Sequence, residues 1–468
     1  MRYLIITFFL FVFCCSLYGQ QHNHELHSQS EHASISSIEG TADEDTLVEF
    51  LKFMSRDPKL KADGFLFLNT NWSDTYRAPL VDIIRLSRDR WQVESVERLF
   101  QTHAKDLSID FYQAKQKLWA EPPSYGNYYL DFKSQMYKYL DPKFSGYFYG
   151  RNGTSKIRVD EIMWGGVVQD GIPPLRNPKM LSATDADYLG DSDVVFGLVI
   201  DGDARAYPKR ILAWHEFFTD EISGKSIAGV YCTLCGTVII YDAEVNGVRH
   251  ELGTSGFLYR SNKLMYDKAT QSLWNTILGK PVLGPLIDQG IEMGTLPVVT
   301  TTWGEWKAHH PSTTVLSLET GHKRNYDEGV AYNEYFATDE LMFPVPQIDT
   351  RLDNKARVFI PRIDGYKEDP IAISVGYLKK KKLHQDKIGN QKFLVITSHR
   401  GASSMYEVNG QEFKSYKKGV LKDVDGNVWE VKEDKLVGPK GEQLLRLPAH
   451  ESFWFAWYNT YASTRLIK

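Results

Sequence analysis

The residues best suited to chemistry are two cysteines separated by two other residues, Cys232 and Cys235. The chain has four cysteines, and the other two, Cys14 and Cys15, lie in an apolar run at its start. In an extended strand, residues three apart have α-carbons about 10 Å apart, whereas a disulfide needs about 5.5 Å. A turn between Cys232 and Cys235, helped by the glycine that follows them, would therefore have to bring the sulfurs together.

Three kinds of chemistry fit such a pair. Redox-active thiols would cycle through a disulfide. A metal site for copper or zinc would use both thiolates and needs at least one further ligand. A structural disulfide or inert thiols are the third interpretation, but so short a loop adds little stability when it is closed. Only half of a metal site is visible in this motif, so we favour the redox interpretation.

Another group must activate the thiols, because residues 227–231 and 238–241 have strand-like sequences on both sides of the pair. The pair then lies in a strand–turn–strand and lacks the helix N-terminus that lowers a thiol pKa in thioredoxin-like motifs. His215, seventeen residues before Cys232, is the predicted base or stabilising cation, and Arg205 is predicted to be an outer charge. In the metal interpretation, His215 completes a ligand set with the two cysteines.

The start of the chain is predicted to be a signal peptide over residues 1–19. A basic residue precedes an apolar run over 4–18, which is shorter than the roughly 20 residues that span a membrane. A lipoprotein signal at Cys14 or Cys15 is less favoured, because a bulky Phe13 stands where a small residue is usual. No other segment is apolar enough to span a bilayer, so we expect a periplasmic or extracellular protein.

Composition predicts a globular protein and excludes some partners. The 468 residues are 42% hydrophobic, 13% aromatic and 24% charged, with a net charge of −4. That charge gives no reason to expect nucleic acid, and no basic cluster interleaved with aromatics is present. The expected partner is an unidentified redox protein or a small-molecule substrate.

The pattern along the chain predicts an α+β fold. Residues 20–45 are polar and are predicted to be a disordered linker. Residues 46–145 have helical periodicity and predict a small domain of four to six helices. From 155 to 468, short β-type runs alternate with turn signals, which predicts a β-rich domain.

This β-rich domain is predicted to be duplicated, with copies near 190–320 and 355–468. An offset of 165 residues places VYCTLCGTVIIYD on VITSHRGASSMYE. Further on, Trp303-x-x-Trp306 is matched by Trp454-x-x-Trp457, and each is followed by a Ser-Thr pair. Matches that recur in the same order indicate two related halves.

The duplication serves as an internal control for function. At the 165-residue offset, Cys232 becomes Thr397, Cys235 becomes Arg400 and Lys380 stands opposite His215. Tryptophans and glycines occur in both copies and are interpreted as structural. The cysteines and His215 occur in one copy, which predicts a single active site in the first half.

Longer motifs resemble one known family. These are DGIPPL at 170–175, YCTLCGT at 231–237, SGFLYRSNKLMYDKATQSLWN at 255–275 and FWFAW at 453–457. Over roughly 158–465 the chain resembles the exported bacterial family catalogued as domain of unknown function 3179, although Thr233 replaces the usual proline. Some relatives are catalogued as selenoproteins. The resemblance therefore implies that Cys232 and Cys235 are a reacting pair.

The sequence thus predicts a thiol-based oxidoreductase, in which Cys232, Cys235 and His215 converge in a partly accessible pocket. One alternative is a non-catalytic protein that binds or delivers copper or zinc with the same three residues. Another is an envelope interaction module whose helical domain recognises a partner.

Overall fold

Aspartates begin several of the N-terminal helices. Asp57 accepts from the amides of residues 59 and 60, and Asp89 and Asp110 cap later helices in the same way, which satisfies amides that have no partner within the helix. The computed structural model describes residues 42–468, and the predicted signal peptide and residues 20–41 of the predicted linker lie outside this range. The helices of this part are α1 (Ala42–Phe53), α2 (Pro58–Thr70), α3 (Arg77–Leu86), α4 (Arg90–His103), α5 (Phe111–Trp119), α6 (Tyr129–Tyr137) and α7 (Ser145–Phe148), with short 3₁₀ turns at Asp74–Tyr76, Pro142–Phe144 and Val159–Glu161.

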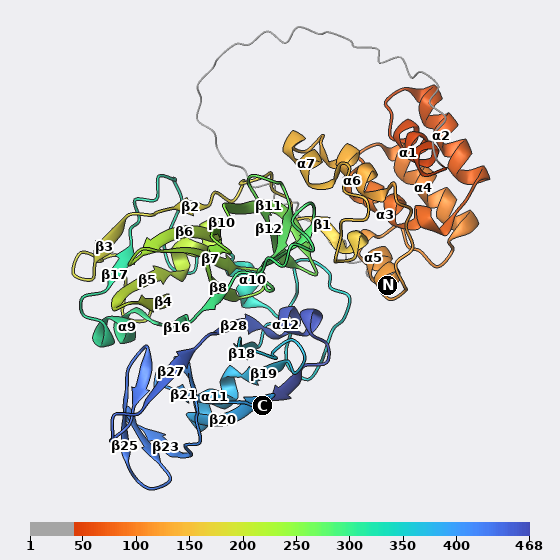
Figure 1. The fold of residues 1–468 in the computed structure, drawn as a ribbon. Coiled ribbons are helices and arrows are strands. Elements are labelled where there is room, and N and C mark those ends of the chain that lie inside the picture. Colours follow the sequence, from red (N-terminus) through yellow and green to blue (C-terminus); the bar gives the residue numbers. More distant parts are fainter. Residues whose placement is uncertain (1–41) are drawn as a thin grey trace, which may run out of the picture. The chain divides into compact units, whose positions relative to one another are not determined.

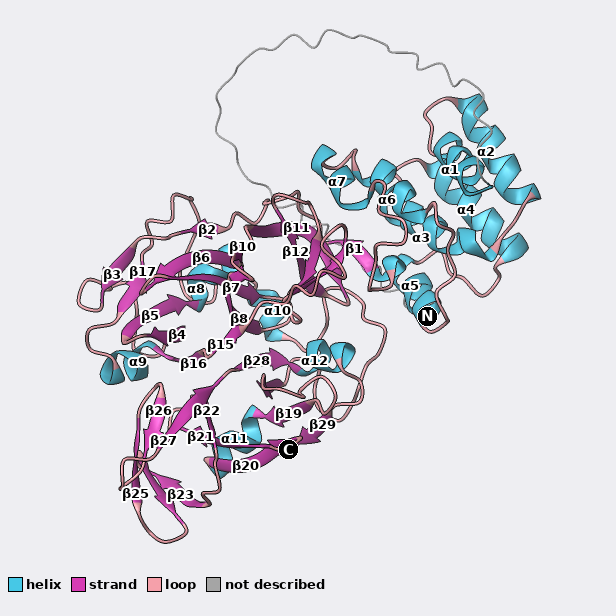
Figure 2. Ribbon diagram, viewed as in Figure 1, coloured by secondary structure: helices cyan, strands magenta, loops and turns pink. Residues whose placement is uncertain are grey.

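These elements confirm the predicted order, with helices first and β-structure after them (Figures 1 and 2). The first helix begins at Ala42, before the predicted start at 46, and α7 extends the series beyond the expected number of helices. Helices α1 and α2 cross closely at Gly64, where an added side chain would come within 2.5 Å of the Phe53 backbone nitrogen. No helix within 42–468 is both long and apolar enough to cross a membrane.

Apolar and polar contacts join the helical part to the β-rich part. The Phe257 ring lies 4.9, 4.8 and 5.1 Å from the rings of Tyr137, Phe144 and Phe148. Inside the helices, the buried Asp82 carboxylate pairs with two buried lysines. The same lysine ammonium groups donate to the carbonyls of Asp160 and Ile162, at the start of the β-rich part. The helices therefore share one core with the sheets instead of forming a separate body.

The first copy is built from two five-stranded sheets and a five-stranded meander. One sheet has the order β16-β4-β5-β17-β3, the second β15-β8-β7-β6-β2, and the meander β1-β11-β12-β13-β14. The strands and helices are β1 (Ile162–Trp164), β2 (Leu175–Arg176), β3 (Met180–Ser182), β4 (Val194–Ile200), β5 (Asp203–Pro208), α8 (Lys209–His215), β6 (Phe217–Ile222), β7 (Lys225–Cys232), β8 (Thr237–Asp242), β9 (Glu244–Val245), β10 (Val248–Arg249), β11 (Leu252–Tyr259), β12 (Asn262–Asp267), β13 (Leu273–Asn275), β14 (Lys280–Leu283), β15 (Thr295–Leu296), β16 (Val299–Thr302), α9 (Trp303–His309) and β17 (Thr314–Leu316).

The second copy has a four-stranded sheet, β28-β18-β19-β29, and an eight-stranded sheet, β20-β21-β22-β27-β26-β25-β24-β23. A helix, α10 (Asn333–Ala337), lies in the segment between the copies. The remaining elements are β18 (Arg357–Pro361), β19 (Ile371–Ser374), α11 (Val375–Lys381), β20 (Leu383–Ile388), β21 (Gln391–Thr397), β22 (Ser403–Glu407), β23 (Phe413–Lys417), β24 (Val420–Asp423), β25 (Val428–Val431), β26 (Lys435–Val437), β27 (Gln443–Leu447), β28 (Ala449–Phe453), α12 (Trp454–Thr460) and β29 (Arg465–Ile467).

The strand pairings confirm the duplication. In the first copy β4 pairs antiparallel with β16 and β5, and β5 pairs parallel with β17; β18, β28, β19 and β29 repeat this pattern with the same directions. A tryptophan–threonine hydrogen bond recurs at the same place, from Trp306 to Thr313 at 2.8 Å and from Trp457 to Thr464 at 2.9 Å. The tryptophans are thus structural, as the sequence indicated.

The register corrects the alignment of the two copies around the cysteines. Phe217 pairs with Val230 and Leu383 with Ile396, so the offset before the turn is 166 and not 165. Ser398 then stands opposite Cys232, and Lys381, the last residue of α11, opposite His215. The turn of the second copy is one residue shorter, which restores the 165-residue offset at Gly401. A constant offset cannot detect such a deletion inside a turn.

Candidate functional site

A tight turn brings the two cysteine sulfurs together. Strand β7 ends at Cys232, which pairs with Thr237 at the start of β8. Within the turn, the Cys235 amide donates to the Cys232 carbonyl at 3.2 Å, and Gly236 has a positive φ of 56°. A side chain at Gly236 would come within 2.7 Å of the Phe453 ring, so glycine is required here for space as well as for conformation. The two sulfurs, both free thiols, lie 2.9 Å apart.

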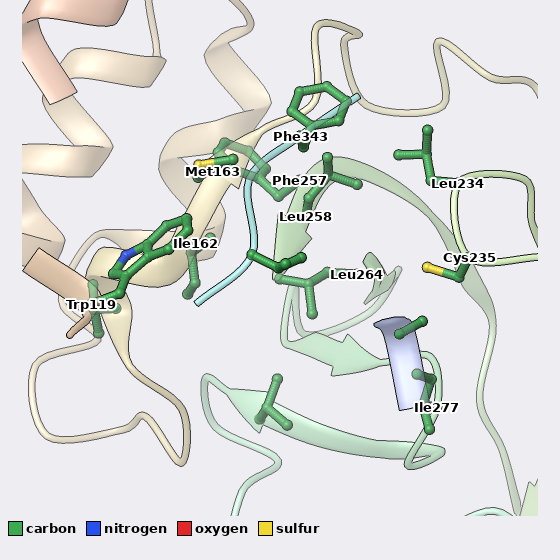
Figure 3. Close-up of a cluster of buried hydrophobic side chains, with 14 of the residues drawn as sticks. Trp119, Ile162, Met163, Leu234, Cys235, Phe257, Leu258, Leu264, Ile277 and Phe343 are labelled. Atoms are coloured by element: carbon green, nitrogen blue, oxygen red, sulfur yellow. The ribbon is translucent and has the colours of Figure 1, made fainter. Parts of the chain in front are cut away.

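Both thiols are buried, and the prediction of a partly accessible pocket is wrong. Cys232 is 1% exposed and Cys235 is 0% exposed. Figure 3 shows Cys235 at the edge of a hydrophobic cluster that includes Leu234, Leu264 and Ile277. A reagent can therefore reach the sulfurs only when the covering residues move.

Two polar groups from the β11–β12 hairpin contact the Cys235 sulfur. The Asn262 side-chain amide donates to it at 3.2 Å, and the sulfur lies 3.4 Å from the Ser261 carbonyl oxygen. Arg260 and Ser261 form the hairpin turn and have φ values of 51° and 61°. Because non-glycine residues seldom adopt this conformation, two in succession mark a constrained turn. This turn positions Asn262 against the thiol.

A buried carboxylate, Glu216, stands beside the cysteine turn. Glu216 directly follows helix α8 and has a left-handed φ of 56°, so the backbone leaves the helical path at this residue. Its carboxylate accepts from the Thr233 hydroxyl and, at 3.1 Å, from the Tyr332 hydroxyl. The Lys263 ammonium lies 3.4 Å from the same carboxylate and donates to the Glu216 carbonyl at 2.8 Å. The buried Glu216–Lys263 pair therefore lies beside Thr233, the residue that follows Cys232.

These surroundings separate the pKa values of the two thiols. Burial and the Glu216 charge raise the pKa of Cys232, but the hydrogen bond with Cys235 and the amide and charge of Lys263 outweigh them and lower the pKa below its ordinary value. Burial and the neighbouring Cys232 raise the pKa of Cys235 well above its ordinary value. Since the thiolate is the reactive form, Cys232 is the better nucleophile and Cys235 keeps its proton.

The other two predicted site residues do not bond to the sulfurs. His215 is buried, and its Nδ1 lies 2.8 Å from the Pro173 carbonyl and its Nε2 2.6 Å from the Tyr326 hydroxyl. Burial lowers the His215 pKa to about 4, so the ring is neutral near pH 7. Arg205 pairs with Asp220 at 2.7 Å and with Asp203 at 3.2 Å. Helix α8 sends His215 and Glu216 to different neighbours, and Glu216 is the one beside the turn.

The two cysteine sulfurs lie closer together here than two thiolates bound to one metal ion would. Two thiolates on a tetrahedral zinc, at Zn–S of about 2.3 Å, lie about 3.8 Å from each other, which is farther apart than these two sulfurs at 2.9 Å. Within residues 42–468, no three His, Cys, Asp or Glu side chains are arranged to hold a metal ion. The third ligand proposed from the sequence, His215, uses both ring nitrogens elsewhere.

The second copy has other residues where the first copy has Glu216, Asn262 and Lys263. The residue that ends its α11 with the same left-handed conformation is Lys382, where the first copy has Glu216. Its equivalent hairpin is shorter: Leu421 pairs with Trp429 as Met265 pairs with Trp274, so the turn at Lys418 and Gly419 falls at the positions of Asn262 and Lys263. The sequence analysis missed Glu216, Asn262 and Lys263 as site residues. A signal was present, since Ser-Asn-Lys interrupts an apolar run between residues 257 and 266.

Comparisons with known proteins add a family to this geometry. No curated protein and no solved structure shows a significant match to the chain. A family model described as a protein of unknown function, DUF3179, matches residues 169–464, which include the cysteine turn, the Asn262–Lys263 hairpin and both copies. Because this match extends over more than half of the sequence, the chain belongs to the DUF3179 family.

Proposed function

We propose that the protein is a thiol-based oxidoreductase whose reacting pair is Cys232 and Cys235. The single observation that carries the proposal is the 2.9 Å approach of two free thiols with oppositely shifted pKa values. A buried thiol without polar neighbours would have a raised pKa and would be inert. Here the lower pKa of Cys232 favours attack, and the protonated neighbour is ready to resolve it.

The internal duplication supports this proposal. The second copy repeats the core strand pairings without the cysteines and without Glu216, Asn262 and Lys263. Burying a charged pair such as Glu216–Lys263 costs free energy and is seldom the most stable solution for a core. The fold therefore does not need these residues, and a chemical role accounts for their presence in one copy.

The proposed reaction is thiol–disulfide exchange with a substrate disulfide. The Cys232 thiolate attacks one sulfur of the substrate, which forms a mixed disulfide and releases the first substrate thiolate, which is then protonated. Cys235 then attacks the Cys232 sulfur and its proton passes to the departing second substrate thiolate, which leaves a Cys232–Cys235 disulfide. Two electrons pass from the dithiol to the substrate, and the reverse sequence oxidises a substrate dithiol.

Access to the buried pair is expected to depend on the segment around α10. The Tyr335 hydroxyl donates to the Leu234 carbonyl at 2.6 Å, directly over the turn. We expect Tyr335→Phe to speed alkylation of the reduced thiols by iodoacetamide about fivefold, because loss of a hydrogen bond of about 1 kcal/mol eases local opening. Tyr377→Phe, which removes a tyrosine hydroxyl in the second copy, is the matched control and should leave the rate unchanged. Equal rates for Tyr335→Phe and the unaltered chain would show that α10 does not limit access.

We also propose that the protein is exported, since an oxidising compartment suits a reversible disulfide. The residues concerned, 1–19, lie outside the described part of the structure. Protein purified from the envelope of expressing cells should begin between Gly19 and Gln21, and intact-mass measurement checks this. Retention of Met1 contradicts export, and a lipid mass on Cys14 or Cys15 shows anchoring instead.

A further inference from the structure

The thiol site does not use His215, although the duplication singled this residue out. His215 is 0% exposed, and its ring packs 5.2 Å from the His322 ring. Because the Pro173 carbonyl can only accept, His215 Nδ1 carries the hydrogen and Nε2 accepts from the Tyr326 hydroxyl at 2.6 Å. His215 therefore fixes the Tyr326 side chain, which lies in the loop that follows β17.

This loop lines a hollow of about 850 Å³, which we name the 318–327 pocket. That volume lies within the range typical of ligand sites, about 300–1,000 Å³. Its lining residues are Tyr188, Arg210, Leu318, His322, Lys323, Arg324, Asn325, Tyr326 and Asp327. Two tyrosines and a leucine offer apolar surface, and the charged lining is predominantly basic.

Three hydrogen bonds between helix α8 and the loop after β17 hold the loop in place. Arg210 bonds Glu328 at 3.3 Å, Trp214 donates to the Asn325 carbonyl at 2.8 Å, and His215 accepts from Tyr326. The Tyr326 hydroxyl is also 2.6 Å from Thr320, which closes the loop on itself. The backbone of the pocket is thus held before any ligand arrives, which reduces the entropy cost of binding.

Two positive charges at the rim of the pocket have no carboxylate partner in the described chain. Arg210 is neutralised by Asp193 at 2.7 Å and by Glu328. By contrast, the Lys323 and Arg324 side chains are exposed, and no carboxylate in the described chain lies within ion-pair distance of either. The Arg324 guanidinium donates to the Lys323 carbonyl at 3.0 Å. Asp327 is the one carboxylate among these lining residues, against the two unpaired cations, so the free charge of the pocket is positive.

We propose that the 318–327 pocket binds a small anion that carries more than one phosphate or carboxylate group. Lys323 and Arg324 would neutralise the anionic groups, with Arg324 suited to a bidentate contact. The Tyr188 and Tyr326 surfaces would support the rest of the ligand. The proposal is independent of the redox function, although the same helix α8 ends at Glu216 beside the thiols.

Isothermal titration of the mature, full-length protein tests this proposal, with inorganic pyrophosphate and citrate as separate probes at constant ionic strength. We expect saturable one-to-one binding of at least one probe, and the tighter probe distinguishes phosphate from carboxylate recognition. The double variant Lys323→Ala/Arg324→Ala should bind at least tenfold more weakly, equivalent to about 1.4 kcal/mol. Both residues are exposed, so the variant is expected to fold.

The matched control is Lys380→Ala/Lys381→Ala, which removes two exposed charges from the corresponding helix α11 of the second copy. This control should keep the affinity of the unaltered protein. An equal loss in the control, or no saturable binding of either probe, overturns the proposal. Cys232→Ser should bind the probes normally, so a failure of the redox function leaves this result interpretable.

Discussion

Single cysteine mutations are expected to separate the two steps of the reaction, which are attack on the substrate disulfide and resolution of the mixed disulfide. When the reduced protein is treated with oxidised glutathione, the unaltered chain should form the Cys232–Cys235 disulfide and release reduced glutathione. Cys235→Ser should stop at a glutathione adduct on Cys232, because the resolving sulfur is gone. Cys232→Ser should react at least tenfold more slowly, since the pKa of Cys235 is raised well above its ordinary value. Neither variant can complete reversible oxidation, and intact mass follows each species with time.

The pH dependence gives an additional check on the nucleophile. The lowered pKa of Cys232 means that its thiolate persists below the ordinary thiol pKa of about 8.5 and is lost as the pH falls through the lowered value. The rate at which the reduced chain is first attacked, followed as loss of the reduced mass, should therefore rise with pH and reach a plateau below a pH of about 8.5. Cys232→Ala and Cys235→Ala serve as fold controls by circular dichroism, because alanine avoids burying a hydroxyl. Unreactive thiols in every chain, or equal rates for the two serine variants, would contradict the assignment.

Loss of the Asp82 carboxylate is expected to destabilise the protein strongly. Its two oxygens lie 2.6 Å from Lys115 Nζ and 2.7 Å from Lys133 Nζ, and the Tyr129 hydroxyl donates to it at 2.7 Å. Both lysines are 0% exposed. Asp82→Ala should therefore lower the free energy of unfolding by about 3–5 kcal/mol, because it leaves two buried ammonium groups without a counter-charge. Urea denaturation followed by circular dichroism measures this loss.

A surface aspartate of the same helical part is the control for Asp82. Asp106 pairs with Arg77, but its side chain is 44% exposed, so Asp106→Ala should cost no more than about 1 kcal/mol. Replacement of the whole cluster, as in Asp82→Leu/Lys115→Met/Lys133→Met, should recover most of the stability, since no buried charge remains. A loss for Asp82→Ala as small as that for Asp106→Ala would show that the lysines find solvent or another partner.

Most of the fold prediction was based on the repeated motifs. Paired tryptophans and a glycine after the turn recur because each copy needs the same packing, such as the Trp306–Thr313 and Trp457–Thr464 hydrogen bonds. The order of helices and then strands followed from local periodicity. The exact equivalence at the cysteines could not be predicted, because a deletion in a turn changes no hydrophobic pattern.

The partners of the thiols were harder to predict than the thiols. His215 and Glu216 are neighbours in sequence, and either could have faced the sulfurs. The left-handed backbone at Glu216 brings that side chain to Thr233, while the His215 ring stays with Pro173 and Tyr326. A conformation that most residues avoid has no reliable signature in a single sequence.

By itself, the sequence determined that Cys232 and Cys235 are closely spaced, that a glycine allows the turn between two strands, and that the β-rich part is built twice. These features depend on residue type and short spacing. Only the tertiary structure decided that the thiols are buried, and that Asn262 and Lys263, from another hairpin, surround them together with Glu216. Contacts between segments about 30 residues apart depend on strand register and hairpin geometry, and a shift of one residue would turn those side chains to the opposite face.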